Sequence, residues 1–436
     1  AIVLTSNGTS TIRTSSGSEG NSAVRDALYG VICVLSRSNL PLDKMTWLFG
    51  KGELGSSTIS IGTATLLFGC IAAEEEALRP RAVAALDALL AAYCRLISLE
   101  DSSQGSDAMT AATMVVDNPW GELAVPTDAI IKDSDATTKV HQGELCKLLL
   151  PLLWNSAQHS QPKQSRVAAA RWASDLLCIL DLISACHILC FLSGDSDLTA
   201  ASIARDALKI GKDSQKDTTS SSSKSPADFS KLVGVLLTEN KVAVNNSFWR
   251  QNFWQFTPQG QAVAIEYLVQ CLLHDIYGGD DDSTITFVSA IATSIQNATK
   301  NARREYLGLL DECAEALSLC LSTSALARTF ITSPNSPLTP STIEELALGC
   351  NSSKARRLLA ESWGQLYLDP SLWVNNEWHA TVETSLRSCC ELIQGNTSSV
   401  ANKHGAAFLG GTCIKVSRRH PTLISSESMS SLASRI

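Results

Sequence analysis

The sequence predicts an all-α fold of the HEAT/armadillo-like α-solenoid type, an α-α superhelix. Amphipathic stretches of about a dozen to twenty residues follow one another along most of the chain, and no alternating strand pattern separates them. Helix pairs recur at about forty residues once inserts are subtracted, which is typical of HEAT and armadillo repeats. Of the 436 residues, 44% are hydrophobic and only 6% aromatic, which favours helices that pack through small residues.

The segment from Arg166 to Leu180 shows the repeating unit. One helical face carries the apolar residues Ala169, Trp172, Ala173, Leu176 and Leu180. Arg171 and Asp175 lie off that face. A helix of this kind cannot bury its apolar stripe alone, so it needs a partner helix and then a neighbouring pair.

Composition divides the chain into four predicted segments. Residues 1–20 are polar and rich in Gly and Ser, and we expect a disordered N-terminal connection. HEAT-like repeats are expected over 21–212, with a long loop at 99–139, and again over 227–436. Between the two sets, residues 213–226 form a Ser-rich flexible insert that cannot bury enough apolar area to offset the entropy of ordering it.

Apolar residues at helical spacing place the individual helices. In the first half of the chain we expect them at Ala23–Arg37, Asp43–Phe49, Thr58–Ala72, Arg79–Ser98, Gln142–Trp154, Ser165–Leu180, Ile183–Leu192 and Thr199–Ile210, with a short one at Ala108–Val115. In the second half we expect them at Ala227–Thr238, Pro258–Tyr277, Ser283–Gln296, Asn301–Ser322, Thr342–Leu348, Ser353–Leu368, Trp373–Gln394, Ser398–Ser417 and Pro421–Ser434. The stops are the run Gly278–Asp282 and the three prolines of Ser333–Pro340.

Charge and hydropathy argue against nucleic acid and membrane as partners. The net charge is −8, and the basic residues are scattered singly or in pairs. The pairs are Arg303-Arg304, Arg356-Arg357 and Arg418-Arg419, and we interpret them as solvated helix faces. Nucleic-acid binding needs a clustered basic footprint, so nucleic acid is not expected as a partner. No apolar run reaches the roughly twenty residues that span a bilayer, so no integral membrane segment is expected either.

Fourteen cysteines are present, and most lie inside apolar helical stripes. Buried free thiols behave as small hydrophobes in a reducing compartment, which predicts a cytoplasmic and nuclear location. Of the adjacent pair Cys389-Cys390, we expect one thiol to be exposed.

Three short patterns suggest chemistry, and each has a simpler explanation. Gly50–Gly55 matches G-x-G-x-x-G, but no strand precedes it, so we interpret it as an interhelical loop. Cys186-His187-x-x-Cys190 lacks a second ligand pair and is interpreted as helix core rather than a zinc site. Asp280–Asp282 lacks the Gly and the terminal Glu of a calcium loop.

Two further clusters bear on the surface of the protein. Glu74–Glu76 is interpreted as solvated charge ahead of a helix. The aromatic cluster of Phe248, Trp249, Phe253, Trp254 and Phe256 is interpreted as core between neighbouring repeats, with an exposed protein-binding patch as the alternative. We therefore predict no catalytic, cofactor-binding or metal-binding residue.

Four stretches of the chain, taken in order, resemble segments of a known family. They are Val24–Leu28 with its following apolar helix, Leu48–Leu54, Arg166–Asp195 with its apolar run, and Lys354–Tyr367 followed by His404–Gly410. In that order they resemble the large HEAT-repeat proteasome adaptor and scaffold family. The Ser-rich insert, the loop at 99–139 and Asp206, where the family pattern has Glu, depart from it. The chain opens at Ala1 without Met, and we expect it to represent part of a larger scaffold.

The resemblance implies a non-catalytic scaffold that binds the 26S proteasome and stabilises the association of its core and regulatory particles. The partners would be proteins, above all proteasome subunits, with no cofactor and no small-molecule substrate. Packing motifs assign no contact residues, although exposed cations such as Arg303 and Arg304 are expected to meet acidic partner surfaces. Two alternatives stay open: a HEAT-repeat adaptor of nuclear transport or translation control, and a helical appendage of an enzyme whose catalytic domain lies outside this chain.

Overall fold

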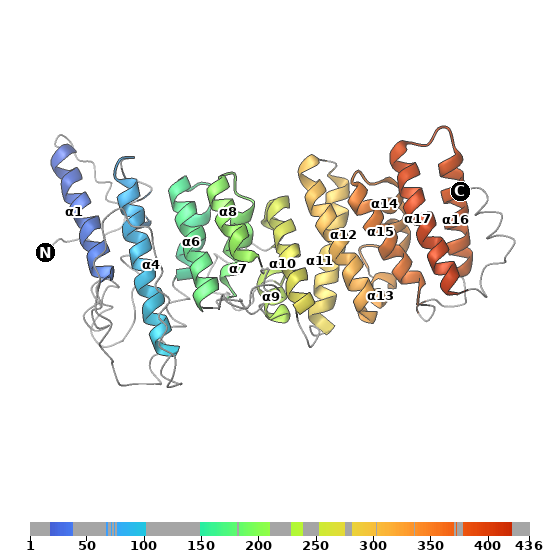
Figure 1. The fold of residues 1–436 in the computed structure, drawn as a ribbon, viewed down its shortest axis with the longest axis horizontal. Coiled ribbons are helices and arrows are strands. Elements are labelled where there is room, and N and C mark those ends of the chain that lie inside the picture. Colours follow the sequence, from blue (N-terminus) through green and yellow to red (C-terminus); the bar gives the residue numbers. More distant parts are fainter. Residues whose placement is uncertain are drawn as a thin grey trace, which may run out of the picture. The chain divides into compact units, whose positions relative to one another are not determined.

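The structure, a computed structural model, is helical throughout its described part. It describes residues 18–37, 67–68, 71, 74, 76–101, 149–180, 183–209, 228–238, 253–274, 281–301, 303–334, 336–369, 372 and 378–420. Within these ranges the regular elements are helices and no strand occurs, so the predicted all-α class is confirmed (Figure 1). The chain forms two compact units, Ala1–Leu180 and Asp181–Ile436.

In the first unit, α1 (Ser18–Arg37) packs against α4 (Arg79–Asp101), and α4 packs against α6 (Lys163–Leu180). Residues 149–157 are also helical. The α6 stripe is buried as predicted at Ala169, Trp172, Ala173 and Leu176. Trp172 meets the edge of Phe68, with ring centroids 5.6 Å apart. The core of this unit is therefore built from one helical face, as the apolar spacing indicated.

In the second unit, five helices form a row in which each contacts the next, and we call them the row helices. They are α7 (Ala185–Ser193), α10 (Pro258–His274), α12 (Leu307–Thr323), α15 (Ser353–Tyr367) and α17 (Val400–Arg419). In Figure 1 they follow one another from green to red. Every residue of α7 is buried, whereas the later row helices keep an exposed edge.

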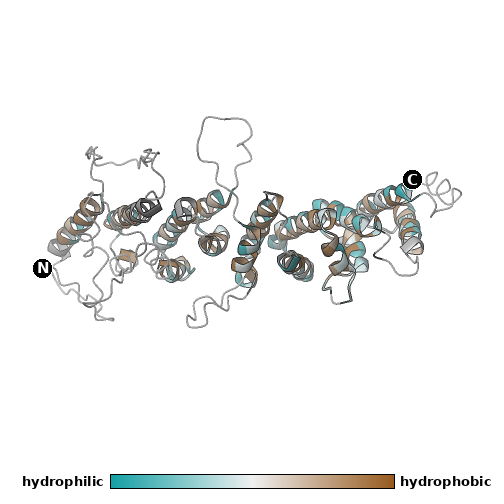
Figure 2. Ribbon diagram, turned by 90° about the horizontal axis from the view of Figure 1, so that it is seen from below, coloured by the Kyte–Doolittle hydropathy of each residue, from teal (hydrophilic) through white to brown (hydrophobic). Residues whose placement is uncertain are grey.

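The other helices of the second unit flank the row. They are α8 (Leu198–Leu208), α9 (Phe229–Leu236), α11 (Asp281–Lys300), α13 (Ala325–Thr332), α14 (Pro340–Gly349) and α16 (Trp378–Gln394), with short 3-10 turns at Phe253–Gln255 (η5) and Arg304–Tyr306 (η6). α11 contacts α9, α12 and α13, while α14 contacts both α15 and α17. Figure 2 shows apolar and polar residues interspersed along these helices, as amphipathic packing requires.

Capping side chains define where the helices begin. The side chain at the N-cap accepts a backbone N–H of the first turn at Asp197, Asp228, Ser324, Thr339, Ser352 and Ser399. Such caps satisfy amide donors that have no partner inside the helix. At α14 the cap Thr339 precedes Pro340, whose fixed φ and missing N–H suit the first helical position.

One close approach between helices depends on glycine. A Cβ at Gly405 of α17 would lie 2.7 Å from Leu348 Cα, and closer still to the carbonyl oxygens of Ala347 and Leu348 at the end of α14. These neighbours are backbone atoms, which cannot move aside as the tip of a long side chain can. Gly405 thus sets the distance between α14 and α17.

The predicted helix positions agree with the described helices except at a few boundaries. α1 begins at Ser18, inside the predicted disordered connection, because a first turn needs no apolar residues of its own. α4 continues past Leu99 into the predicted loop. α13 was not predicted: its buried residues are only Ala327 and Ile331, too few to make a periodic pattern.

Several predicted segments lie outside the described residues. These are the helices at Asp43–Phe49, Ala108–Val115 and Pro421–Ser434, and most of the one at Thr58–Ala72. The Ser-rich insert at 213–226 and the loop from 102 to 139 also lie outside them.

Candidate interaction surface

The row helices α12, α15 and α17 run in the same direction. Near their starts, Lys354 of α15 forms ion pairs with Glu312 (3.4 Å) and Glu315 (2.7 Å) of α12. At the far end, His420 Nε2, at the C-cap of α17, donates to the carbonyl oxygen of Leu368, at the C-cap of α15 (3.3 Å). Their solvent-facing edges therefore lie side by side on one surface.

A polar network joins the starts of α12 and α15. The hydroxyl of Ser352 donates to the carboxylate of Asp311 and also accepts the N–H of Ala355 (3.2 Å), so it caps α15 and ties it to α12. Burial raises the pKa of Glu312, while Lys354 opposes this rise. The pKa of Lys354 is raised, chiefly by its hydrogen bond to Glu315.

The pair Arg356-Arg357 is split between core and surface, which corrects its interpretation as a solvated face. Arg357 is exposed, but Arg356 is only 6% exposed. Arg356 donates to the carbonyl oxygen of Cys350 (2.5 Å) and to Nδ1 of His404 on α17 (3.2 Å). Because Arg cannot accept, Nδ1 of His404 is the acceptor and its proton lies on Nε2. Arg356 lies on the side of α15 that contacts α17, whereas Arg357 lies on a side that is exposed to solvent, so the two adjacent arginines differ in burial.

Arg356→Ala is expected to lower the free energy of unfolding by about 2 kcal/mol, because it leaves the Cys350 carbonyl without its side-chain donor and removes a buried link to α17. Arg357→Ala is the matched control. Arg357 makes only an exposed contact with Glu361 at 4.0 Å, so its loss should change stability by less than about 0.5 kcal/mol. Urea denaturation followed by tryptophan fluorescence measures both. Equal effects of the two substitutions would contradict the burial of Arg356.

The pair Arg303-Arg304 is exposed, as predicted. Arg303 forms a solvent-exposed ion pair with Glu305 at 3.6 Å, within the same turn. An exposed ion pair of this kind contributes little to stability. The guanidinium groups of Arg303 and Arg304 therefore both stay accessible to solvent. The pair Arg418-Arg419 is likewise exposed, at the end of α17.

Cys186, His187 and Cys190 are all buried in α7. His187 stacks edge-on against Phe256, with centroids 5.0 Å apart. Burial in apolar surroundings raises the pKa of the Cys190 thiol well above its usual value, so this thiol stays protonated at neutral pH. The structure places the motif in the core, and no group of three or more metal-binding side chains occurs among the described residues.

Cys389 and Cys390 are both buried, so the expectation that one thiol is exposed is wrong. The buried positions of α16 also include Val382, Ser385 and Leu386. These five follow the spacing i, i+3, i+4, i+7, i+8, the wide stripe of a helix packed on more than one neighbour. Burial raises the pKa of Cys389 to about 12, and the carboxylate of Glu344 adds to the rise.

The aromatic cluster is core at its described positions, with one exception. Phe253 and Phe256 are buried, and Phe256 also meets Phe191 of α7 (centroids 6.3 Å apart). Trp254 is 39% exposed and stacks edge-on against Phe253. Phe248 and Trp249 lie outside the described residues.

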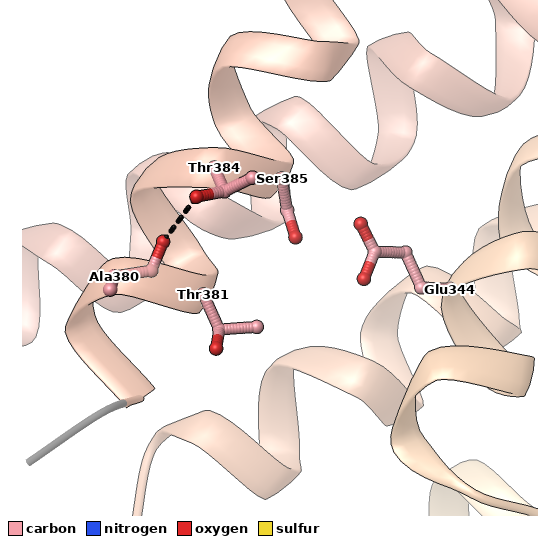
Figure 3. A pocket seen from close by; sticks show the side chains of 5 residues that line it. All are labelled: Glu344, Ala380, Thr381, Thr384 and Ser385. Atoms are coloured by element: carbon pink, nitrogen blue, oxygen red, sulfur yellow. Dashed lines mark hydrogen bonds between the residues drawn. The ribbon is translucent and has the colours of Figure 1, made fainter.

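A shallow hollow of about 420 Å³ lies between α14 and α16 (Figure 3). Glu344 faces Thr381 and Ser385 across it, and Thr384 also lines it. The hydroxyl of Thr384 donates to the carbonyl oxygen of Ala380 (2.6 Å), so it is already engaged. The lining offers one carboxylate and three hydroxyls, and it includes no imidazole, thiol or amine. It can hydrogen-bond a polar group.

In the first unit, two carboxylates share one arginine. Asp87 of α4 forms an ion pair with Arg171 of α6 (3.0 Å), and Asp175 lies one turn along α6. Burial raises the pKa of Asp175 to about 6, with a further rise from the charge of Asp87. Burial also raises the pKa of Asp87, against the lowering effect of Arg171. This cluster is therefore sensitive to pH.

Asp175→Asn is expected to stabilise the protein at pH 8. The folded pKa of about 6 lies above the ordinary value of 3.8, so the ionised form is disfavoured by folding. The free energy of unfolding of the unmodified protein should be nearly constant above pH 7 and rise as the pH falls from about 7 through 6 towards 4. At pH 8 the variant should be more stable by about 1–2 kcal/mol, after allowing for partial exposure, and the difference should disappear near pH 4.

Urea denaturation at a series of pH values measures this effect. Asp206→Asn is the control, because Asp206 is exposed and its hydrogen bond with Lys209 lowers its pKa. That substitution should not stabilise the protein at pH 8. A flat difference between Asp175→Asn and the unmodified protein from pH 4 to 8 would exclude a raised pKa.

Glu74 is buried, which corrects its interpretation as solvated charge. It is 7% exposed and forms an ion pair with Arg25 of α1 at 3.1 Å. The hydroxyl of Tyr29 donates to its other oxygen at 2.6 Å. Sequence could not show this, because both partners come from a helix that precedes it by more than forty residues. Glu76 is exposed as expected.

Of the other predicted motifs, Gly50–Gly55 lies outside the described residues, and Asp281 and Asp282 form the first turn of α11. Among the described helices, none has both the length and the apolar character needed to cross a membrane. Comparisons of the chain with protein-family models, curated proteins and solved structures find no match. The resemblance to the proteasome scaffold family therefore stays a prediction.

Proposed function

We propose that the chain is a HEAT/armadillo-like α-solenoid that acts as a non-catalytic scaffold, holding protein partners on the exposed edges of its row helices. The observation that carries the proposal is the row itself. α12, α15 and α17 begin at Leu307, Ser353 and Val400, so each follows the last after 46 and 47 residues. HEAT and armadillo repeats have periods of about 40 to 47 residues.

The contact pattern supports a repeat architecture. Each row helix contacts the next, and flanking helices such as α11 and α14 fill the second layer. In a solenoid every repeat is stabilised by its neighbours, which produces long surfaces rather than enclosed pockets. The shallow hollow at Glu344 is consistent with a surface of this kind.

The partner we propose is the 26S proteasome, on the resemblance of the ordered sequence segments. A scaffold that contacts both the core and the regulatory particle favours the associated form by mass action, because it binds that form with two surfaces. This activity requires no active site.

Affinity purification of the tagged chain with quantitative mass spectrometry tests the partner. We expect subunits of both proteasome particles to be enriched over a tag-only control. In a second assay, purified core and regulatory particles are mixed with the chain, and native gels measure the associated fraction, which should rise. Enrichment of transport receptors, translation factors or a single enzyme, without proteasome subunits, would overturn the proposal in favour of another adaptor or an enzyme appendage.

A further inference from the structure

α17 has an unusual charge distribution for a chain of net charge −8. Its twenty residues contain no Asp or Glu. They include four cations at Lys403, Lys415, Arg418 and Arg419. Lys415 and both arginines are exposed, and Lys403 is partly exposed. The helix therefore presents positive charge alone.

These four cations form no ion pair or side-chain hydrogen bond with any described residue. Cations on neighbouring helices behave differently. Lys354 is paired with two glutamates, Arg387 with Glu383, and Arg328 with Asp369. Within the described part of the second unit, α17 thus carries four such unpaired cations, and the other two are Lys300 at the end of α11 and Arg304 in η6.

The helix dipole accounts for only part of this concentration. Lys415, Arg418 and Arg419 lie near the C-terminal end of α17, where cations are favoured. Lys403 lies in the first turn, where the dipole disfavours a cation. His404, beside it, accepts a hydrogen bond from the buried Arg356, which adds a further positive charge at that end.

Between these two charged ends the exposed face of α17 is small and apolar. Ala407 and Gly411 are exposed, and a Cβ at Gly411 would meet nothing within 4 Å. Phe408 is partly exposed and lies against the ring of His404, with centroids 4.6 Å apart. An apolar centre with a charged rim is the usual anatomy of a protein-binding patch.

We propose that this face of α17 docks an acidic segment of a partner protein, with carboxylates at both ends of a short apolar middle. The inference deepens the proposed scaffold function and rests on it. Lys403 and Arg418 are fifteen positions apart on the helix, which spans about 22 Å at 1.5 Å per residue. The segment is therefore about fifteen residues long if helical, or about seven if extended.

The surroundings favour protein over nucleic acid. α17 packs against α14 and α16, which carry Glu344, Glu383 and Glu391. A polyanion running past α17 would meet these carboxylates, whereas a short segment can stop before them. The apolar centre at Ala407, Phe408 and Gly411 also adds nothing to binding a phosphate backbone.

The test uses a fluorescein-labelled peptide with Glu-rich ends and a Leu-rich middle, titrated into the full chain and followed by fluorescence anisotropy. We expect binding that weakens as salt rises. Lys403→Gln/Lys415→Gln/Arg418→Gln should weaken binding at least about tenfold. The matched control is Lys209→Gln/Lys231→Gln/Lys300→Gln, which removes the same charge from other helices and should leave binding unchanged. Circular dichroism confirms that both variants fold.

Three results would overturn the inference: no binding of the peptide, equal loss in both triple variants, or equal binding of a peptide with Gln in place of Glu. Tighter binding of duplex DNA or of phosphatidylserine vesicles would also overturn it, in favour of those ligands. Co-purification of proteasomes is scored separately. If proteasomes co-purify with the chain but the peptide does not bind, this inference is wrong and the proposed partner stands. If the peptide binds and the α17 variant loses that binding, but no proteasomes co-purify, the proposed partner is wrong and this inference stands.

Discussion

Gly405→Ala is expected to lower the free energy of unfolding by about 3 kcal/mol or more, because a methyl group at this position has no space. The added Cβ would overlap the carbonyl oxygens of Ala347 and Leu348 and lie 2.7 Å from Leu348 Cα. Relief would require α14 and α17 to move apart, which opens the packing of both against α15. Urea denaturation followed by circular dichroism should show a clearly lower midpoint.

Gly411→Ala, on the same helix, is the control. A Cβ at Gly411 meets nothing within 4 Å, and alanine forms helix more readily than glycine. This substitution should leave stability unchanged or raise it by up to about 1 kcal/mol. If the two variants unfold at the same urea concentration, the close approach of α17 to α14 is not present in solution.

Trp363→Ala is expected to cost about 3–5 kcal/mol, the usual range for removing a buried large aromatic side chain. Trp363 is fully buried in α15, and its ring lies 4.2 Å from that of Tyr367. Its indole N–H has no hydrogen-bond partner in the described structure, so the loss is one of packing and cavity formation. Thermal unfolding monitored by circular dichroism measures the effect.

Trp254→Ala makes the same chemical change at an exposed site. Trp254 is 39% exposed and contacts Phe253 at 5.0 Å between ring centroids, so its removal should cost about 1 kcal/mol. A cost for Trp363→Ala no larger than that for Trp254→Ala would show that α15 is not enclosed by its neighbours.

Helix positions were predictable where several apolar residues recur at helical spacing. In the helix predicted at Asn301–Ser322, Leu309, Cys313, Leu317 and Cys320 recur at helical spacing, and all four are buried in α12. α13 was missed because an eight-residue helix with two buried positions leaves no comparable pattern. Periodicity thus reports helices that bury a long face, and short connecting helices escape it.

The surroundings of charged and polar residues were less predictable. Glu74 and Arg356 were both interpreted as solvated, yet each is buried against a distant helix. One thiol of the pair Cys389-Cys390 was expected to be exposed, yet both are buried. In each case the deciding contact comes from another element, and spacing along one helix cannot report it. The unpaired state of the α17 cations is likewise a property of packing, because it depends on which acids the neighbouring helices bring close.

The two hydrogen bonds of the Ser352 hydroxyl couple the stability of α15 to the position of α12. The same oxygen that stabilises the first turn of α15 also donates to Asp311 of α12. A misplaced α12 therefore leaves the start of α15 less well held, so that the two helices open together rather than one at a time. The hydrogen-bonded amide protons of both helices should therefore exchange with solvent at matching rates, as members of one cooperative unit.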